Sequence, residues 1–556
     1  MISKDKLSSK NRQELVDYIK KTNYDLVVIG GGVTGAGIAL DAVTRGVSTL
    51  LIEKEDYASG TSSRSTKLIH GGLRYLKQLE LGLVKETGQE RAIVHNMAPH
   101  LTIPEKMLLP LTKTGSLGKT STSIALKVYD FLADVEDSDK RKMLEMEQVL
   151  EMEPLLEGNT ELVGGAIYAE YRTDDARLTI ELIKKATLYG ADCINYVAAK
   201  ELSYNSDGFV DGLKLEDQIS GETFDITAKV VVNATGPWGD IFRKKDKSLS
   251  ERQLHLTKGV HLVVPWERLP VKQALYFDVP DGRMIFTIPR QKITYIGTTD
   301  TTYKGDVNRI TANMEDAEYL IKAVNNMIPS SHLKIEDVVS TWAGLRPLIH
   351  QPGKSASEIS RKDEMFESKS GMITIAGGKL TGFRKMAERV TDRVLVRLIE
   401  KTGNTFDRCS TENMKLEGNR FKKYSSVKKY IKELAEDLKE LGYSKSDARY
   451  LIHNYGTQAE DILDRLKDKK RKYSLVGEEA VFCIKREMVQ NLRDFYIRRT
   501  GRLYFDIGSI EPSKDEVLGV FQDYLGWDDA KSSEEWKSME DEIGMVLEFK
   551  EEIVSS

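Results

Sequence analysis

The chain has 556 residues, of which 40% are hydrophobic and 30% charged, and its formal net charge is -4. This length exceeds a compact domain of about 100–200 residues, so we expect two or three domains. The small net charge argues against nucleic acid as a partner, and the composition is that of an ordinary globular protein.

The cysteines and the apolar stretches indicate in which cellular compartment the protein works. Cys193, Cys409 and Cys483 lie far apart, which argues against a disulfide framework or a zinc site and suits a reducing compartment. Residues 1–23 form a polar lead-in without the apolar centre of a secretory signal. The uncharged stretch 26–40 is shorter than the roughly 20 apolar residues of a spanning helix, so membrane contact should be peripheral.

The first predicted elements form a β-α-β unit. Residues 24–30 are an apolar, β-rich run, 38–46 have a helical pattern, and 47–53 form a second apolar run. This order is typical of the opening of a doubly wound nucleotide-binding domain.

The middle of the chain mixes helices and strands. A charged helix is predicted over 140–154, ending at Pro154, and another over 176–190. The predicted strands are 191–202, 228–236, 259–265, 283–289, 292–300 and 371–378.

Helical periodicity dominates the last part of the chain. Apolar residues follow Phe383 at intervals of three and four, and after residue 401 only helical patterns recur, as in Ala480, Ile484 and Met488. We therefore predict that the residues after 401 form a separate helical domain.

A glycine motif connects the first strand to its helix. Gly30 permits a tight turn, Gly32 allows close approach of a pyrophosphate, and Gly35 allows the helix to pack on the sheet. Backbone N–H groups and the helix dipole then face the phosphates. Glu53 can accept from ribose hydroxyls and disfavours NADP, so this motif predicts a dinucleotide site for FAD or NAD.

Longer strings downstream are more specific than the glycine motif. Together they resemble FAD-dependent glycerol-3-phosphate dehydrogenases, members of the D-amino-acid-oxidase-like flavoprotein group. The resemblance covers roughly 24–398 and continues more weakly through IRRTGRL at 497–503. The strings are SGTSSRSTKLIHGGLRYL (59–76), VNATGPW (232–238), TKGVHLVVP (257–265), YIGTTDTTYKGD (295–306), WAGLRPL (342–348) and AGGKLTGFRKMAE (376–388).

The resemblance implies an α/β fold with a Rossmann-like FAD-binding domain assembled from separated segments. An α+β substrate domain with an antiparallel sheet and a C-terminal all-helical domain complete it. We assign 24–75, 165–240 and 335–400 to the FAD domain, 76–164 and 241–334 to the substrate domain, and 401–556 to the helical domain. The implied activity oxidises sn-glycerol 3-phosphate to dihydroxyacetone phosphate, with hydride passing from C2 to FAD and electrons passing onward to a membrane quinone.

Cations are needed for the phosphate dianion of such a substrate. Arg346 lies in an otherwise apolar string and is a candidate for this contact, with a structural ion pair as the alternative. The resemblance adds Arg74, Tyr75 and Arg361 as substrate contacts. Lys379, at the start of a helix, is a candidate both for substrate binding and for stabilising negative charge on reduced flavin.

A base must take the proton of the C2 hydroxyl. His261 is the candidate, because an unperturbed histidine pKa of about 6.5 suits this exchange. A satisfied core histidine is the alternative, and His70 is the second choice. Gly382 stands where threonine is commoner in the family, which leaves a hydroxyl role there unsupported.

The predicted FAD contacts come from the glycine motif, the end of the second strand, the hydroxyl-rich turn and two later strand ends. They are Gly30, Gly31, Gly32, Val33, Thr34, Gly35, Glu53, Lys54, Thr61, Ser62, Ser63, Ser65, Lys67, Leu68, His70, Gly71, Gly72, Val197, Ala234, Thr235, Gly236, Gly378, Lys379, Leu380 and Thr381.

Several alternatives remain open. An NAD-dependent dehydrogenase, a flavin amine oxidase and a non-enzymatic dinucleotide-sensing protein share the glycine motif. A glycerol-3-phosphate oxidase that makes peroxide is nearer, but the insertion found in some oxidases is not evident. We expect no metal, consider a homodimer, and expect the chain at the cytoplasmic face of the cell membrane. The basic run 466–473 could attract anionic lipid or could be a solvated helix face.

Overall fold

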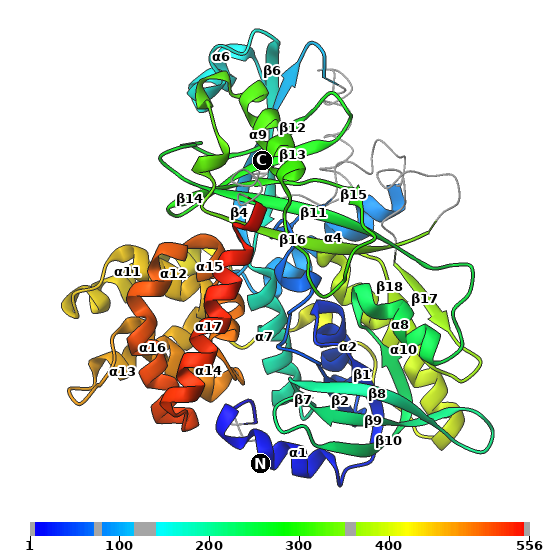
Figure 1. Cartoon of the computed structure of the whole chain (residues 1–556). Coiled ribbons are helices and arrows are strands. Elements are labelled where there is room, and N and C mark those ends of the chain that lie inside the picture. The colour runs from blue at the N-terminus through cyan, green and yellow to red at the C-terminus, as the bar shows by residue number, and fades with distance from the viewer. Residues whose placement is uncertain (1–5, 72–80, 116–140, 351–362, 550–556) are drawn as a thin grey trace.

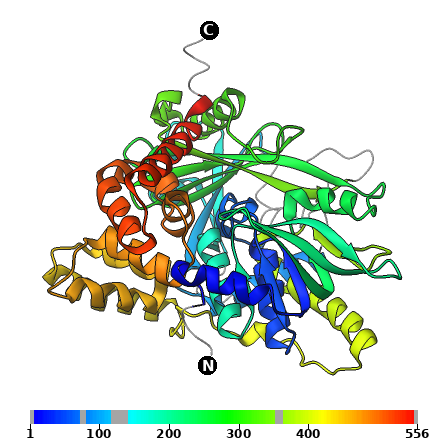
Figure 2. The ribbon, with the colours of Figure 1, turned by 60° about the horizontal axis from the view of Figure 1, so that its bottom comes forward.

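The computed structural model describes residues 6–71, 81–115, 141–350 and 363–549. Two large sheets and a group of C-terminal helices make up this part of the chain (Figure 1). In both Figure 1 and Figure 2 the C-terminal helices, coloured yellow to red, lie to one side of the sheets. The predicted fold class is therefore confirmed.

The first sheet begins with the predicted β-α-β unit. Its strand order is β17-β18-β10-β1-β2-β7, and the hairpin of β8 and β9 extends β10. The central strands pair in parallel, so segments far apart in the sequence lie side by side. The strands are β1 (Tyr24–Ile29), β2 (Thr49–Ile52), β7 (Asp192–Ile194), β8 (Val197–Tyr204), β9 (Val210–Asp217), β10 (Thr223–Asn233), β17 (Glu364–Glu367) and β18 (Ile373–Ala376).

Helices bury the central strands of this sheet. Helix α2 (Val33–Thr44) contacts both α7 (Asp175–Leu188) and α10 (Phe383–Thr402). The apolar residues of β1 and β2 are almost fully buried, as expected for parallel strands covered on both faces. Helix α8 (Gly239–Lys245) follows β10, and α1 (Arg12–Ile19) precedes β1.

The second sheet has ten strands in the order β15-β11-β14-β13-β12-β4-β6-β3, with β16 paired to β11 and β5 to β6. Its neighbours pair antiparallel, as predicted, except for the parallel pair β4 and β12. The strands are β3 (Leu68–Ile69), β4 (Ile103–Thr112), β5 (Lys142–Leu144), β6 (Leu162–Arg172), β11 (Leu254–Pro265), β12 (Ala274–Asp278), β13 (Met284–Arg290), β14 (Ile293–Gly297), β15 (Thr301–Thr302) and β16 (Ser340–Ile349).

Two details of this region differ from the sequence-based expectation. The charged segment 140–154 is not one helix, because Lys142–Leu144 pairs with β6 and only Met146–Met152 (α6) is helical. The strands β6 and β16, which lie in segments that we assigned mainly to the FAD domain, pair within the second sheet. Strand pairing with distant partners decides both points, and local periodicity does not report it.

Helices cover the second sheet and form the C-terminal region. Helix α9 (Met314–Met327) shares a core with β11 and β14, while α4 (Leu81–Met97) lies near the first sheet. The C-terminal helices are α11 (Tyr424–Glu440), α12 (Lys445–Tyr455), α13 (Ala459–Lys467), α14 (Leu475–Arg486), α15 (Arg502–Phe505), α16 (Ile510–Leu525) and α17 (Asp529–Met545), with a π-helix at Asp494–Arg499.

The apolar core of the C-terminal helices continues into the second sheet. Tyr295 and Trp342 of that sheet belong to the same buried cluster as Val427 and Phe482. Met488, expected on a helical face, instead follows α14 with a φ of 53°. Across the described ranges, no helix is both long and apolar enough to cross a bilayer.

Buried ion pairs also join the C-terminal region to the first sheet. Arg498 and Arg499 donate to Asp56, four residues beyond the end of β2, at 2.5 and 2.6 Å. Arg177 of α7 donates to both carboxylate oxygens of Glu487, at 2.6 and 2.8 Å. We call these five residues the buried charge cluster. Their side chains are at most 10% exposed, so the IRRTGRL string includes two structural arginines.

Candidate active site

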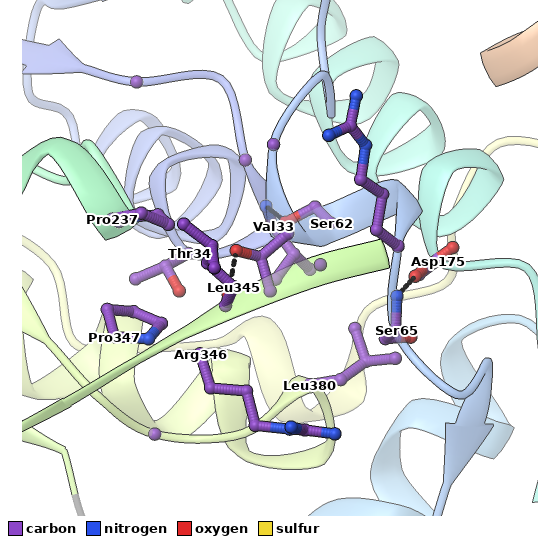
Figure 3. A pocket seen from close by; sticks show the side chains of 18 of the residues that line it. Val33, Thr34, Ser62, Ser65, Asp175, Pro237, Leu345, Arg346, Pro347 and Leu380 are labelled. Atoms are coloured by element: carbon purple, nitrogen blue, oxygen red, sulfur yellow. Dashed lines mark hydrogen bonds between the residues drawn. The ribbon is translucent and has the colours of Figure 1, made fainter. Parts of the chain in front are cut away.

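A cavity of about 730 Å³ lies where the two sheets meet, with walls from the glycine turn, β11 and β16. Such a volume is within the range of about 300–1,000 Å³ typical of small-molecule and cofactor sites. Figure 3 shows Val33, Thr34 and Ser62 on one side of it, and Arg346 and Leu380 on another.

The glycine turn brings a helix N-terminus to the cavity. Gly30 has a φ of +114°, and a β-carbon at Gly35 would lie 1.9 Å from Gly30 O, so both positions require glycine. Helix α2 therefore starts at Val33 against the end of β1. Val33 N–H donates to Ser62 Oγ at 2.9 Å, which ties the helix start to the hydroxyl-rich turn (Figure 3).

Glu53 lies directly after β2 and lines the same cavity. Its carboxylate accepts from the N–H groups of Gly31 at 2.7 Å and Glu55 at 3.0 Å. Burial raises the pKa of Glu53 to about 7, against the opposing effect of these two N–H groups. This half-buried carboxyl would therefore gain from further hydroxyl donors, such as those of a ribose.

The hydroxyl-rich turn is fixed between the two sheets. Thr61 Oγ1 donates to Leu345 O at 2.7 Å, and Ser65 N–H donates to Asp175 Oδ2 at 2.9 Å (Figure 3). Lys67 Nζ, 2.5 Å from Asp175 Oδ1, also donates to Ser63 O. Lys67 and Ser63 thus support the turn from behind and do not line the cavity.

Arg346 extends from β16 into the cavity (Figure 3). Its guanidinium donates to Asp300 Oδ1 and Thr299 O, both at 3.2 Å, and to Thr298 Oγ1 at 3.0 Å. Gly259 on the neighbouring strand makes room, because a β-carbon there would lie 2.3 Å from Arg346 Nη2. Arg346 thus forms an ion pair, as the structural alternative expected, and it also lines the cavity, where a substrate contact would have to lie.

His261 lies on β11, stacked on Trp342 with ring centroids 4.8 Å apart. Its Nε2 is 3.0 Å from Thr66 Oγ1, whereas Nδ1 is buried and has no hydrogen-bond partner in the described part of the chain. Burial, followed by the charges of Arg346 and Lys67, holds the pKa of His261 well below its usual 6.5. The imidazole is therefore neutral at neutral pH and able to accept a proton.

A second glycine-rich strand end forms another wall. Gly378 has a φ of +80°, and Lys379 precedes the short 3-10 helix Leu380–Gly382 that leads into α10. Thr381 Oγ1 donates to His70 O at 3.0 Å and accepts from His70 N–H at 3.1 Å. Thr381 thereby holds the His70 backbone beside the cavity without lining it.

Most of the predicted site residues meet at this cavity. Those that line it are Gly30, Gly32, Val33, Thr34, Glu53, Lys54, Thr61, Ser62, Ser65, Leu68, His70, Val197, Ala234, Thr235, Gly236, His261, Arg346, Gly378, Lys379 and Leu380. Those in the structure that do not line it are Gly31, Gly35, Ser63, Lys67, Gly71 and Thr381. Gly72, Arg74, Tyr75 and Arg361 lie outside the described residues.

One group at the rim, formed by Asn308, Lys54 and Trp238, was not predicted from the sequence as a whole. Asn308 Oδ1 accepts from Lys54 Nζ at 3.0 Å and from Trp238 Nε1 at 2.9 Å. Lys54 also lies over the Trp238 ring, 4.3 Å from its centroid. Trp238 belongs to a string with family resemblance, but no local pattern marks Asn308. In the described ranges, no group of three or more candidate ligands could hold a metal ion.

These features fit a dinucleotide. Backbone N–H groups at a helix start, glycines without side-chain bulk and a half-buried carboxylate line one connected cavity. Residues that would hold FAD are therefore present.

Comparison with known proteins gives two family matches. Residues 25–384 match a family described as FAD dependent oxidoreductase, and residues 409–532 match the C-terminal domain of alpha-glycerophosphate oxidase. Aerobic glycerol-3-phosphate dehydrogenase of Bacillus subtilis is 48% identical over 528 residues, covering 94% of this chain and 95% of the relative. The enzyme of that name from Staphylococcus saprophyticus is also 48% identical, covering 94% of each chain.

A solved structure is similar over nearly the whole chain. Glycerol-3-phosphate dehydrogenase from Bacillus halodurans, complexed with FAD, is 40% identical with a TM-score of 0.82, covering 97% of this chain and 98% of that one. L-alpha-glycerophosphate oxidase from Mycoplasma pneumoniae is 18% identical with a TM-score of 0.53, which supports the fold alone.

Proposed function

This chain belongs to the FAD-dependent oxidoreductases and, among them, to the aerobic glycerol-3-phosphate dehydrogenases, and from this premise we propose how its residues work. It oxidises sn-glycerol 3-phosphate to dihydroxyacetone phosphate. The observation that supports the site assignment is that Arg346, His261 and Lys379 line the cavity that also holds the glycine turn. When bound, FAD supplies the acceptor for the hydride that leaves C2.

Arg346 binds the substrate phosphate in this proposal. Asp300 holds the guanidinium at the cavity wall, and the planar fork of arginine matches the oxygens of a phosphate. Lys379 adds positive charge at the start of the helical segment that leads into α10. The resemblance also assigns Arg74, Tyr75 and Arg361 to this contact.

His261 takes the proton of the C2 hydroxyl. Its lowered pKa keeps the ring neutral, and Thr66 orients the Nε2 edge. Because Nδ1 is fully buried, Nε2 is the nitrogen that we assign to the exchange. Trp342, stacked against the ring, keeps its plane fixed and excludes water from that face.

A spectroscopic experiment tests the proposed activity. The purified holoenzyme should be yellow, and anaerobic glycerol 3-phosphate should bleach the flavin band, whereas glycerol, which lacks the phosphate, should do so poorly. Equal bleaching by both compounds would overturn the phosphate recognition. A colourless protein that cannot be reconstituted with FAD would overturn the cofactor assignment.

We further propose that a membrane quinone reoxidises the flavin at the cytoplasmic face. Support comes from Lys469 and Lys470, which are exposed in the basic run 466–473 and can meet anionic lipid. The other basic residues of this run are partly engaged, since Lys467 pairs with Asp437 at 3.3 Å and Lys472 pairs with Asp523. The surface is therefore a modest electrostatic anchor.

Stopped-flow mixing separates the acceptors. Pre-reduced holoenzyme should recover its flavin band much faster with a soluble quinone analogue than with oxygen. Reoxidation by oxygen at the turnover rate, with stoichiometric peroxide, would assign the chain to the oxidases instead. Binding to vesicles with anionic lipid, compared with neutral vesicles, tests the attachment, and sedimentation tests the homodimer.

A further inference from the structure

A second cavity of about 220 Å³ lies beside the first, where both sheets and the C-terminal helices meet. The hydroxyl-rich turn and β16 separate the two. Gly344 and Leu345 line the first cavity, whereas Thr341, Trp342 and Ala343 of the same strand line the second. A β-carbon at Gly344 would lie 2.6 Å from Arg64 O, so strand and turn are in direct contact.

Arginines dominate the charge of this second cavity. Its walls include Arg64, Arg309, Arg493 and Arg498, against the carboxylates Glu55 and Glu542. Two of these arginines are compensated by carboxylates. Arg309 donates to Glu548 at 2.6 Å, and Arg498 donates to Asp56 at 2.5 Å and to Asp494 at 2.7 Å.

The other two arginines are not compensated. Among the described residues, the guanidinium groups of Arg64 and Arg493 make no hydrogen bond or ion pair. The Nε atom of Arg493 is fully buried as well. Glu55 pairs with Lys54, and neither Glu55 nor Glu542 forms an ion pair with Arg64 or Arg493.

A buried donor without an acceptor is costly, and two guanidinium groups on one small cavity repel each other. A ligand with several acceptor oxygens and negative charge would remove both costs. The planar fork of arginine matches phosphate oxygens, and the cavity is large enough for a phosphate group with a short substituent.

We propose that the second cavity is a binding site for a phosphate dianion, either free or carried by a small phosphomonoester. Arg64 and Arg493 bind its oxygens from opposite parts of the chain. Because Arg64 lines both cavities, the bound anion connects the C-terminal helices to the turn that borders the flavin cavity. This site is distinct from the Arg346 contact and does not depend on the proposed function.

Calorimetric titration of the oxidised, FAD-loaded full-length protein tests the site. Inorganic phosphate and methyl phosphate are the two probes. We expect two phosphate sites per chain. Arg493→Gln should lose one of them, with affinity weakened by about 10-fold or more, because charge-assisted bonds to a fixed fork are lost. Arg493→Lys, which keeps the charge but loses the fork, should bind with intermediate affinity.

Three further variants make the result decisive. Arg64→Gln should remove the same site, which provides a second test where Arg493→Gln does not fold. Arg346→Gln should remove the other site only. Arg268→Gln, which breaks an exposed pair with Asp337, loses the same unit of charge away from both cavities and should keep both sites.

The outcomes separate this inference from the proposed function. A single wild-type site that Arg346→Gln abolishes would overturn the second site while supporting the substrate contact. Two sites that remain in both Arg493→Gln and Arg64→Gln would also overturn it. A site lost in Arg493→Gln but unaffected in Arg346→Gln supports it even where the Arg346 assignment fails. Tighter binding of one probe identifies free phosphate or a phosphomonoester as the ligand.

Discussion

The flavin cavity and the buried charge cluster both contain arginines, but they use them differently. In the cluster, Arg499 is fully buried and faces both oxygens of Asp56 at 2.6 and 2.9 Å. In the cavity, Arg346 is 20% exposed and pairs with Asp300 Oδ1 at 3.2 Å. The arginines of the cluster are thus buried against carboxylates, whereas Arg346 lies at the wall of an open space that a ligand can enter.

Glutamates differ between these regions in the same way. Burial raises the pKa of each, but the cations Arg177 and Lys184 hold the pKa of Glu487 in the cluster well below its usual range. Glu53 in the cavity accepts from two backbone N–H groups and forms no ion pair among the described residues, so burial raises its pKa to about 7 although these N–H groups and the charge of Lys54 oppose the shift. Charge pairing therefore marks a structural region, and incomplete pairing marks a binding region.

Breaking the cluster should have the largest effect. Asp56→Ala leaves Arg498 and Arg499 buried without their main acceptor, which should lower the free energy of unfolding by about 3–5 kcal/mol. Denaturant unfolding of the holoenzyme measures this change. The control Arg268→Ala breaks the exposed pair with Asp337 and should cost less than about 1 kcal/mol. Equal losses would remove the distinction between the two kinds of ion pair.

The titration of Glu53 should make the stability of the apoprotein depend on pH. Its folded pKa of about 7 lies above the usual 4.5, so unfolding releases a proton between these values. The stability of the apoprotein should therefore fall as pH rises from 4.5 to 7, by up to about 3 kcal/mol. Glu53→Gln should flatten this dependence, and so should bound FAD through its ribose hydroxyls. A wild-type apoprotein whose stability is flat over this range would contradict the prediction.

His261 tests whether a buried histidine in the cavity is chemical or structural. His261→Asn should slow anaerobic flavin reduction by roughly 100-fold, the usual value of a general base. The wild-type rate should fall at low pH, through a pKa below 6.5, because the protonated ring cannot accept the proton. This fall of the rate at low pH should be absent in His261→Asn. If the variant reduces its flavin fast and its rate still falls at low pH, another group takes the proton.

Arg346→Lys should have the smallest of these effects. Lysine keeps the charge but loses the fork, and hydrogen bonds to charged groups contribute roughly 1.5–3 kcal/mol. We therefore expect kcat/KM for glycerol 3-phosphate to fall by about 10–100-fold with flavin content retained. Unchanged kinetics would place Arg346 with the structural arginines. Arg290→Lys, which alters a pair with Asp174, serves as a matched control that should leave kcat/KM for this substrate unchanged.

The sequence predicted those features that depend on short segments. The glycine turn, its helix and Glu53 follow from spacing within 24 residues, because backbone sterics at Gly30 and Gly35 allow few alternatives. His261 and Lys379 were candidates from residue type and position, and both line the cavity. The roles of these residues remain predictions until the variants are measured.

Contacts between distant segments could not be predicted in this way. Asp56 and Arg498 are separated by 442 residues, and no local pattern connects them. Asn308 reaches Lys54 and Trp238 from a loop without a motif. The pairing of β6 and β16 within the second sheet is a similar case, since both strands gain their partners only in the folded sheet.

The strand order of the first sheet has a consequence for synthesis on the ribosome. Strand β10 lies between β1 and β18, which start at residues 24 and 373, so the sheet next to the glycine turn stays incomplete until β18 has emerged. At about 5–20 residues per second, the roughly 140 residues between the end of β10 and the start of β18 take roughly 7–28 s to translate. During that time the apolar edge of β10 is open to chaperones and to neighbouring nascent chains. Capture of FAD should therefore wait until β18, the last parallel strand, has emerged.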